Sequence, residues 1–204
     1  MTILPLLRST NFGLEFMPNV IDTHFIESSK LIKRSLTVLR RPIQESVELI
    51  TLAFKSGGKL LICGNGGSAA ESQHFAAELS GRYLKERNAL PAIALTTDTS
   101  ALTAIGNDYS FVKVFSRQIE ALAKPGDILF CISTSGNSAN IIAAAKAAKS
   151  LKLKTIGLSG NKGGKLKALC DINMIALSNH TPYIQEIHLI AIHTICDLVE
   201  SVLE

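Results

Sequence analysis

The stretch KLLICGNGGSA, residues 59–69, decides the fold class, because a short apolar run ends there in a glycine-rich turn that opens a helix. The run before the turn is apolar almost throughout, which is typical of a strand buried on both faces of a parallel sheet. The glycines let backbone N–H groups approach a ligand closely, and the first helical turn adds donors that lack intrahelical partners. The stretch therefore predicts a strand, a ligand-binding loop and a helix.

Outward from this stretch, the same alternation continues along the chain. The predicted strands are 59–64, 92–96, 127–133, 154–159 and 172–177. The predicted helices between and after them lie near 68–83, 99–106, 111–123, 138–150, 163–169 and 182–203. Because strands that alternate with helices pair in parallel, we expect an α/β fold whose parallel sheet is covered by helices on both faces.

Two further helices are predicted ahead of the first strand, over about residues 20–56. Pro42 fits the first turn of the second helix, and the Gly57-Gly58 pair fits its end. Residues 1–16 carry a short apolar patch without a basic start or a convincing cleavage site. We interpret them as a flexible N-terminal extension, with an upstream start site as the alternative, and residues 17–204 as a single domain.

The composition narrows the classes of function. Of the 204 residues, 47% are hydrophobic and 19% are charged, which suits one domain with a substantial core. Aromatic residues make up 5% and Trp is absent, which weighs against stacking on single-stranded nucleic acid. The net charge of +4 is spread along the chain, and it fits a phosphorylated small molecule as well as a polyanion.

We expect a cytoplasmic protein that contacts neither a membrane nor nucleic acid. No apolar run approaches the roughly 18 residues that a membrane helix needs. The cysteines form no CxxC pair, and Cys63 and Cys131 lie within apolar runs. These positions indicate buried thiols in a reducing compartment.

Two loops that leave predicted strands are candidates for binding an anion: GNGGSA (64–69) and STSGNSAN (133–140). Open parallel sheets bind ligands beyond the carboxyl ends of their strands. The second loop adds the hydroxyl groups of Ser133, Thr134, Ser135 and Ser138. Because neither loop carries the Gly-Lys-Ser/Thr of a P-loop, the two suit a sugar phosphate better than a nucleoside triphosphate.

Two other interpretations of these loops stay open. Serine and glycine also make ordinary turns and helix N-caps. A dinucleotide-binding fold is the functional rival, although GNGGSA is not GxGxxG and no acidic residue closes the second predicted strand.

The helix after the first loop carries a candidate pair. In SQHFAAELSGRY, residues 72–83, His74 and Glu78 lie one helical turn apart on the same side. Such a pair is commonly a solvated surface contact that stabilises a helix by a few tenths of a kcal/mol. It can also share one metal ion through an imidazole nitrogen and a carboxylate oxygen.

Four motifs together carry a family resemblance. They are CGNGGSAAESQHFAAEL (63–79), ALTAIGNDYSF (101–111), ISTSGNSANII (132–142) and IQEIHLIAIH (184–193). In this order they resemble the phosphoheptose isomerases of the sugar isomerase (SIS) domain group, over about residues 20–203. The resemblance implies a flavodoxin-like three-layer αβα sandwich with a five-stranded parallel sheet, and a homotetramer whose N-terminal helices serve oligomerisation. It also implies one zinc ion per site and conversion of sedoheptulose 7-phosphate to manno-heptose 7-phosphate through an enediolate.

The resemblance also implies roles for individual residues. The zinc ligands would be His74, Glu78, Gln185 and His193. Glu78 would also be the general base and His193 the acid. The substrate-binding residues would be Asn65, Gly66, Gly67, Ser68, Glu78, Asn107, Asp108, Ser133, Thr134, Ser135, Ser138 and Gln185.

Helix geometry complicates this ligand set. Gln185 and His193 are separated along one helix by about 12 Å of rise and about 80° of turn. Either Gln185 lies in an irregular first turn, or the two residues serve the sites of different subunits. We favour a site completed across a subunit interface. His188, about 140° from His193 around the helix, is interpreted as a packed or half-exposed histidine.

Some residues keep two interpretations. Asn107 and Asp108 also fit an ordinary helix end and turn, and Arg82 fits a helix-end cation as well as a phosphate contact. The family often carries Arg where this chain has Tyr183, after Pro182, which changes the rim of the predicted site. The rival functions are a SIS-domain adaptor that binds the replication initiator protein, and a module that senses sugar phosphates.

Overall fold

The computed structural model describes residues 17–203, so the extension predicted over residues 1–16 lies outside the described part of the chain. At its centre is a five-stranded parallel sheet in the order β2-β1-β3-β4-β5. The strands are β1 (Leu60–Cys63), β2 (Ala92–Ala94), β3 (Ile128–Ser133), β4 (Lys154–Gly160) and β5 (Ile172–Ala176). Each begins and ends within two residues of its predicted bounds, so the prediction of a five-stranded parallel sheet is confirmed.

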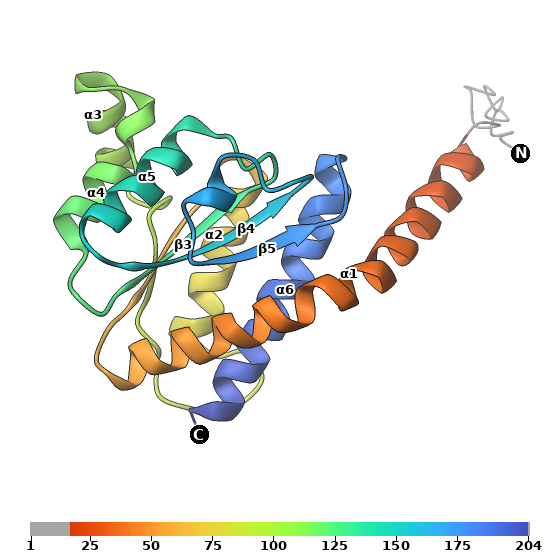
Figure 1. Cartoon of the computed structure of the whole chain (residues 1–204), viewed down its shortest axis with the longest axis horizontal. Coiled ribbons are helices and arrows are strands. Elements are labelled where there is room, and N and C mark those ends of the chain that lie inside the picture. The colour runs from red at the N-terminus through yellow and green to blue at the C-terminus, as the bar shows by residue number, and fades with distance from the viewer. Residues whose placement is uncertain (1–16, 204) are drawn as a thin grey trace, which may run out of the picture.

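Helices cover both faces of this sheet (Figure 1). They are α1 (Met17–Lys55), α2 (Gly67–Ser80), α3 (Thr99–Asp108), α4 (Ser116–Leu122), α5 (Ala139–Ser150) and α6 (Thr181–Val202). Alternate strand residues point to opposite faces. Leu60 and Ile62 join a core with α1, α2 and α6, whereas Leu61 and Cys63 join a second core with α4 and α5. The three-layer αβα sandwich is therefore confirmed.

Burial on both faces holds only for the inner strands. All residues of β1 and β3 are buried, as predicted. The edge strands β2 and β5 are only partly buried, and Ile93 of β2 is 39% exposed. The reason is the strand order, since each edge strand pairs with a single neighbouring strand and its other side is open.

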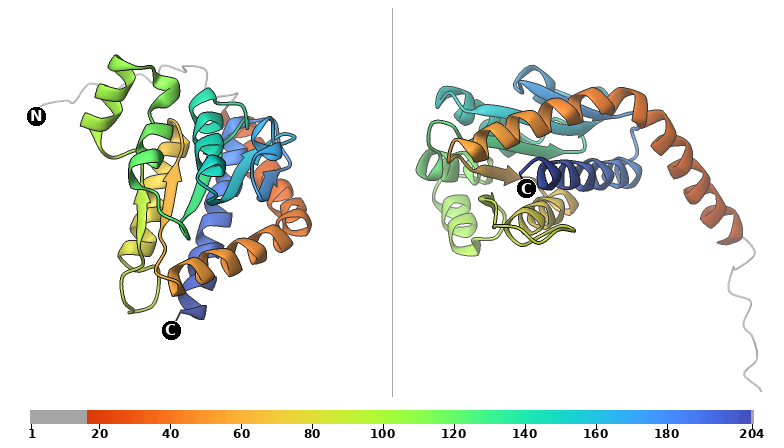
Figure 2. Two further views of the ribbon diagram at one scale, coloured as in Figure 1. Left: turned by 60° about the vertical axis from the view of Figure 1, so that its left-hand side comes forward. Right: turned by 90° about the horizontal axis from the view of Figure 1, so that it is seen from below.

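The prediction of two N-terminal helices is wrong, because α1 runs without a break through Pro42. A proline inside a helix lacks the N–H that would bond to the carbonyl one turn earlier. Here the helix continues because Leu39, Val47 and Ile50 bury their side chains in the first core, and tertiary packing stabilises helices more than propensity does. The N-terminal part of α1 bends away and projects from the sandwich (Figure 2).

Two other predicted helices are shorter than expected. The segment 163–169 forms only a 3-10 turn, η3 (Leu166–Ala168), because Gly163 and Gly164 both adopt positive φ. The segment 111–123 divides into the 3-10 turn η2 (Phe111–Lys113) and α4. The chain turns between them, where the side chains of Val114 and Phe115 are buried in the second core.

Replacing Gly160 by Ala is expected to destabilise the fold by about 1–3 kcal/mol, because overpacking forces neighbours to move. A Cβ at this end of β4 would lie 2.6 Å from Cγ1 of Ile184, at the start of α6. Thermal unfolding measures the effect. Gly106→Ala is the control, because the nearest atom to its added Cβ would be Val114 Cγ1 at 3.8 Å. Equal midpoints for the two variants would contradict the expected strain.

Candidate active site

The two predicted loops meet at one edge of the sheet. β1 and β3 are neighbours and run parallel, and in this strand order the connections diverge between them, which is where open α/β sheets bind ligands. Asn65 in the first loop and Asn140 at the start of α5 exchange two side-chain hydrogen bonds of 2.8 Å each. This amide pair ties the two loops together.

The loop after β3 presents hydroxyl groups at the start of α5. Ser133 is buried, and its Oγ lies 3.2 Å from Oγ of Ser138. Ser135 Oγ accepts a hydrogen bond of 3.1 Å from the backbone N–H of Asn137. Gly136 adopts a φ of 64°, which glycine tolerates without strain. The structure thus gathers the predicted serines of this loop around one helix N-terminus, which favours an anion.

The loop after β1 is equally compact. Gly66 precedes α2 with a φ of 55°, and Ser68 is buried in the first turn of this helix. A Cβ on Gly67 would collide with the side-chain amide of Gln185. The structure therefore brings Gln185 to the first loop, within the same chain.

Helices α2 and α6 pack side by side and carry the other predicted site residues. Contacting positions advance in the same direction along both helices, so the two helices run parallel. In order, the contacts join Gly67 with Gln185, Glu71 with His188, and His74 with His193, and just after α2 the backbone N–H of Tyr83 meets Glu200.

His74, Glu78 and His193 form a small cluster at the rim of this interface, with His74 between the other two. Its Nε2 atom lies 2.8 Å from Nε2 of His193, and its Nδ1 atom lies 3.7 Å from a carboxylate oxygen of Glu78. The side chains of His74 and Glu78 are 40% and 22% exposed. The structure thus brings three of the four predicted ligands together and leaves them accessible.

The fourth predicted ligand is not part of this cluster within one chain. Gln185 lies two contacts earlier along α6, about 12 Å from His193 by helical rise. Within residues 17–203, no group of three or more His, Cys, Asp or Glu side chains is arranged to hold a metal ion. The imidazole nitrogens and the carboxylate do match the donor atoms that zinc prefers.

Two neighbours of the cluster are held neutral. Burial, followed by the charge of Asp197, raises the pKa of the Tyr83 phenol, whose ring lies 5.7 Å from that of His193. Burial, more than the charge of Glu78, raises the pKa of the Cys196 thiol to about 12.

Asn107 and Asp108 do not join the cluster within one chain. They end α3, whose partly buried Leu102 and Ile105 pack on the second core, across the sheet from α2 and α6. The two side chains are exposed and bonded to each other at 2.8 Å. Arg82 is also exposed, and its Nε lies 4.0 Å from Glu86.

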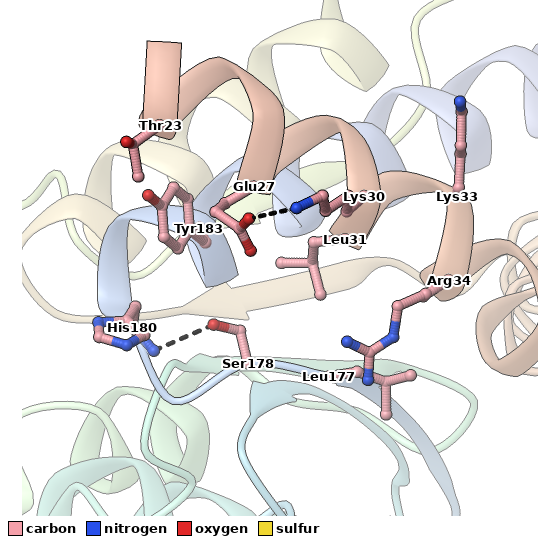
Figure 3. Close-up of a pocket in the computed structure, with 10 residues that line it drawn as sticks. All are labelled: Thr23, Glu27, Lys30, Leu31, Lys33, Arg34, Leu177, Ser178, His180 and Tyr183. Atoms are coloured by element: carbon pink, nitrogen blue, oxygen red, sulfur yellow. Dashed lines mark hydrogen bonds and ion pairs between the residues drawn. The ribbon is translucent and has the colours of Figure 1, made fainter. Parts of the chain in front are cut away.

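Tyr183 lies at a separate cavity of about 700 Å3 between α1 and the start of α6 (Figure 3). Its ring lies 4.8 Å from that of His24 and 5.9 Å from that of His180. Lys33 and Arg34 also line this cavity. Tyr183 therefore belongs to the contact between α1 and α6. It does not line the cluster of His74, Glu78 and His193.

Sequence reasoning missed several residues that build the site. Asn140 lies inside a quoted motif, and an amide at the start of a helix beside a binding loop was a usable signal. Glu71, three residues before His74, shares its face of α2. Arg87 and Glu200, which form a buried ion pair at 3.0 Å, carried no signal, because their contact depends on how distant segments pack.

The family comparisons agree with this architecture. Residues 24–160 match the family model of the SIS domain. With the sheet order and the two loops at the switch point, this match defines the chain as a SIS-domain protein, as its motifs predicted. Within residues 17–203, none of the helices combines the length and the apolar character needed to span a bilayer.

Individual relatives define the family more closely. The phosphoheptose isomerase of Aliarcobacter butzleri is 53% identical over 91% of this chain and 98% of its own. The phosphoheptose isomerase of Helicobacter hepaticus is 55% identical over 91% of this chain and 94% of its own length. The solved phosphoheptose isomerase GmhA from Neisseria gonorrhoeae is 46% identical, with a TM-score of 0.87 over 91% of this chain and 99% of its own. The chain therefore belongs to the phosphoheptose isomerase family.

Proposed function

We propose that this chain is an aldose–ketose isomerase that converts D-sedoheptulose 7-phosphate to D-glycero-D-manno-heptose 7-phosphate. This reaction is the first step of ADP-heptose synthesis for the lipopolysaccharide core. The observation that carries the proposal is the approach of His74 to His193 at 2.8 Å, with Glu78 one turn along the same helix. Family membership supports the choice of substrate.

The chain's own residues divide the chemistry. Moving a carbonyl from C2 to C1 requires a base that takes a proton from C1 and returns it to C2, and a second group that moves the proton between the oxygens. Glu78 is the proposed base and His193 the proposed acid. The serines after β3 bind the phosphate far from the reacting carbons, so that remote binding energy aligns them.

The proposed cofactor is one zinc ion per site, held by His74, Glu78, His193 and Gln185. When bound, zinc would polarise the substrate carbonyl and hold the developing negative oxygen. Because Gln185 lies apart from the other three in one chain, we propose that the complete site forms across a subunit interface.

Assembly into a homotetramer is the proposed means of completing the site. The projecting part of α1 exposes Val20, Ile21, Phe25 and Ile26. An apolar groove of about 500 Å3 lies between α1 and α6. A second copy of this chain is the proposed occupant of both surfaces, since exposed apolar area of this extent is typical of interfaces.

Replacing Phe25 by Glu is expected to shift the protein from a tetramer of 21.9 kDa chains to smaller species. The side chain of Phe25 is 74% exposed, and burying a charge there in an interface is costly. Light scattering after gel filtration measures the mass, and isomerase activity should fall with it. Leu151→Glu, on the far side of the sheet after α5, is the control. A Phe25→Glu protein with the parent's mass would exclude this surface from the assembly.

The proposed activity has a direct test. The zinc-loaded protein is incubated with sedoheptulose 7-phosphate, and NMR or chromatography detects an aldoheptose phosphate. Formation of this product, and its loss after chelation, is the expected result. An inactive protein that binds the replication initiator protein tightly would instead support the adaptor.

The proposed location is the cytoplasm, which the buried free thiols of Cys63 and Cys131 support.

A further inference from the structure

We propose that Glu71 and His188 are positioning residues, which fix the register of α2 against α6 and thereby the approach of His74 to His193. This inference rests on the proposed isomerase function. It concerns two side chains that neither the proposed chemistry nor the proposed zinc ligation uses.

The pair is buried in the interface between the two helices. Glu71 is 9% exposed and His188 is fully buried. Nδ1 of His188 lies 3.4 Å from a carboxylate oxygen of Glu71, which makes a long hydrogen bond. Burying a carboxylate and an imidazole costs free energy that an apolar pair would not. A pair of this kind therefore points to a role beyond packing.

One end of His188 has no partner. Nε2 of this imidazole is buried and makes no hydrogen bond within residues 17–203. If Nδ1 donates its proton to Glu71, Nε2 is an acceptor without a donor. The contact with Glu71 is thus the one polar interaction by which the described chain holds this ring in place.

The pair lies between two contacts of the site. On α2, Glu71 is four residues after Gly67 and three before His74, so all lie on neighbouring parts of one face. On α6, His188 is three residues after Gln185. A slip of one residue along a helix moves a side chain by about 1.5 Å and 100°. Such a slip would separate the two imidazoles, which now lie 2.8 Å apart.

The hydrogen bond between Glu71 and His188 depends on orientation, whereas apolar packing does not. The burial of apolar side chains such as Ile187 and Phe75 in the first core is non-directional, so it does not by itself select one rotation of the helices. A hydrogen bond between a carboxylate and an imidazole is lost over a small rotation, because it depends on distance and angle. Glu71 and His188 therefore select one arrangement of α2 and α6 among several that would pack.

The test compares Glu71→Leu, Glu71→Gln, His188→Leu and His188→Asn in the zinc-loaded protein. Glu71→Leu and His188→Leu remove the hydrogen bond and are expected to lower kcat about tenfold, because a small displacement of catalytic groups slows the reaction, with KM changed less than about threefold. Glu71→Gln keeps an acceptor oxygen and His188→Asn keeps a donor near the position of Nδ1, so kcat should stay within about threefold of the parent in both variants. Thermal midpoints are measured for all four variants, so that unfolding is not counted as a loss of kcat.

Ser72→Ala is the matched control, because Ser72 is the next buried polar residue and bonds only within α2, to the carbonyl of Ser68. A crystal structure of Glu71→Leu adds a readout that is independent of activity. There the Nε2 atoms of His74 and His193 should lie beyond hydrogen-bonding distance.

The proposal is overturned if Glu71→Leu lowers kcat no more than Ser72→Ala or Glu71→Gln does, or if the crystal structure of Glu71→Leu keeps the two imidazoles at the parent's separation. It is also overturned if activity falls only in proportion to the loss of folded protein. An inactive parent would count against the proposed function instead, and the separation of the imidazoles would still decide the role of the pair.

Discussion

Replacing Glu78 by Gln is expected to lower kcat for sedoheptulose 7-phosphate about 10³-fold, which corresponds to about 4 kcal/mol of transition-state stabilisation. The amide has nearly the same shape as the carboxylate but cannot accept a proton from carbon. The side chain of Glu78 lies beside His74 and is 22% exposed, so the fold does not depend on its burial. Progress curves followed by NMR measure kcat and KM together.

The matched control for this substitution is Glu86→Gln. Glu86 lies eight residues further along the chain, its side chain is 91% exposed, and Nε of Arg82 lies 4.0 Å from its carboxylate. This variant should retain the parent's kcat. For Glu78→Gln, KM should change less than about tenfold, because the proposed phosphate site is the loop after β3, which this substitution does not alter. Turnover by Glu78→Gln at the parent's rate would remove Glu78 from the chemistry.

The spacing of His74 and Glu78 shows why part of this site was predictable. Residues four apart on a helix are neighbours whatever the rest of the chain does. The loops were predictable for a similar reason, since a glycine-rich turn after a buried strand always lies at the carboxyl end of a parallel sheet. Local geometry thus transfers directly from sequence to structure.

Contacts between helices were less predictable. The rise between Gln185 and His193 favoured sites on different subunits over an irregular first turn, and within one chain the structure places Gln185 at Gly67 and His193 at His74. The sequence did not say which helix each residue would meet. The amide pair of Asn65 with Asn140 was hidden for the same reason, since its partners are 75 residues apart.

Pro42 illustrates the opposite failure, in which a local rule is overridden. A proline favours the start of a helix, and the expected break was reasonable for an isolated segment. In the structure, burial of residues on both sides of Pro42 holds α1 continuous. Local rules predicted this fold where they agreed with the packing, and failed where the packing was stronger.

Replacing Glu200 by Gln is expected to lower the free energy of unfolding by about 3 kcal/mol, because it leaves a buried cation without its counter-charge. The Glu200 carboxylate is 1% exposed and lies 3.0 Å from Nε of Arg87, whose side chain is 5% exposed. It also accepts hydrogen bonds of 2.8–3.1 Å from the backbone N–H groups of Tyr83, Leu84 and Lys85. Urea titration at fixed protein concentration measures the change.

Loss of the Glu200 charge should also affect the active site. Arg87 donates to the backbone carbonyls of Glu78 and Leu79 at 2.9 Å, so the pair of Arg87 and Glu200 ties the end of α2 to α6. Weakening it should therefore lower kcat along with stability. Glu120→Gln is the control, because Glu120 and Arg117 form an exposed pair at 3.6 Å. Such surface pairs contribute little, and this variant should unfold with the parent.

The pH dependence gives the second part of this prediction. Burial by itself would raise the pKa of the Glu200 carboxyl, but the three backbone N–H groups and Arg87 outweigh it and hold the pKa below its ordinary value of 4.5. A carboxyl whose folded pKa is depressed contributes stability above its unfolded pKa, and this contribution is lost as the pH falls through the folded pKa. The parent should therefore lose stability below about pH 4.5, whereas Glu200→Gln lacks this component.

The difference in the free energy of unfolding between the parent and Glu200→Gln should accordingly be constant near neutral pH and become smaller on acidification. Urea titrations at pH 7 and pH 4 measure this difference. A difference that stayed the same at both values would mean that Glu200 contributes through shape alone. Since glutamine preserves the shape, the decrease isolates the charge. It is this charge, satisfied at once by one arginine and three backbone groups, that we expect to hold the segment after α2 against α6 and keep Tyr83 beside His193.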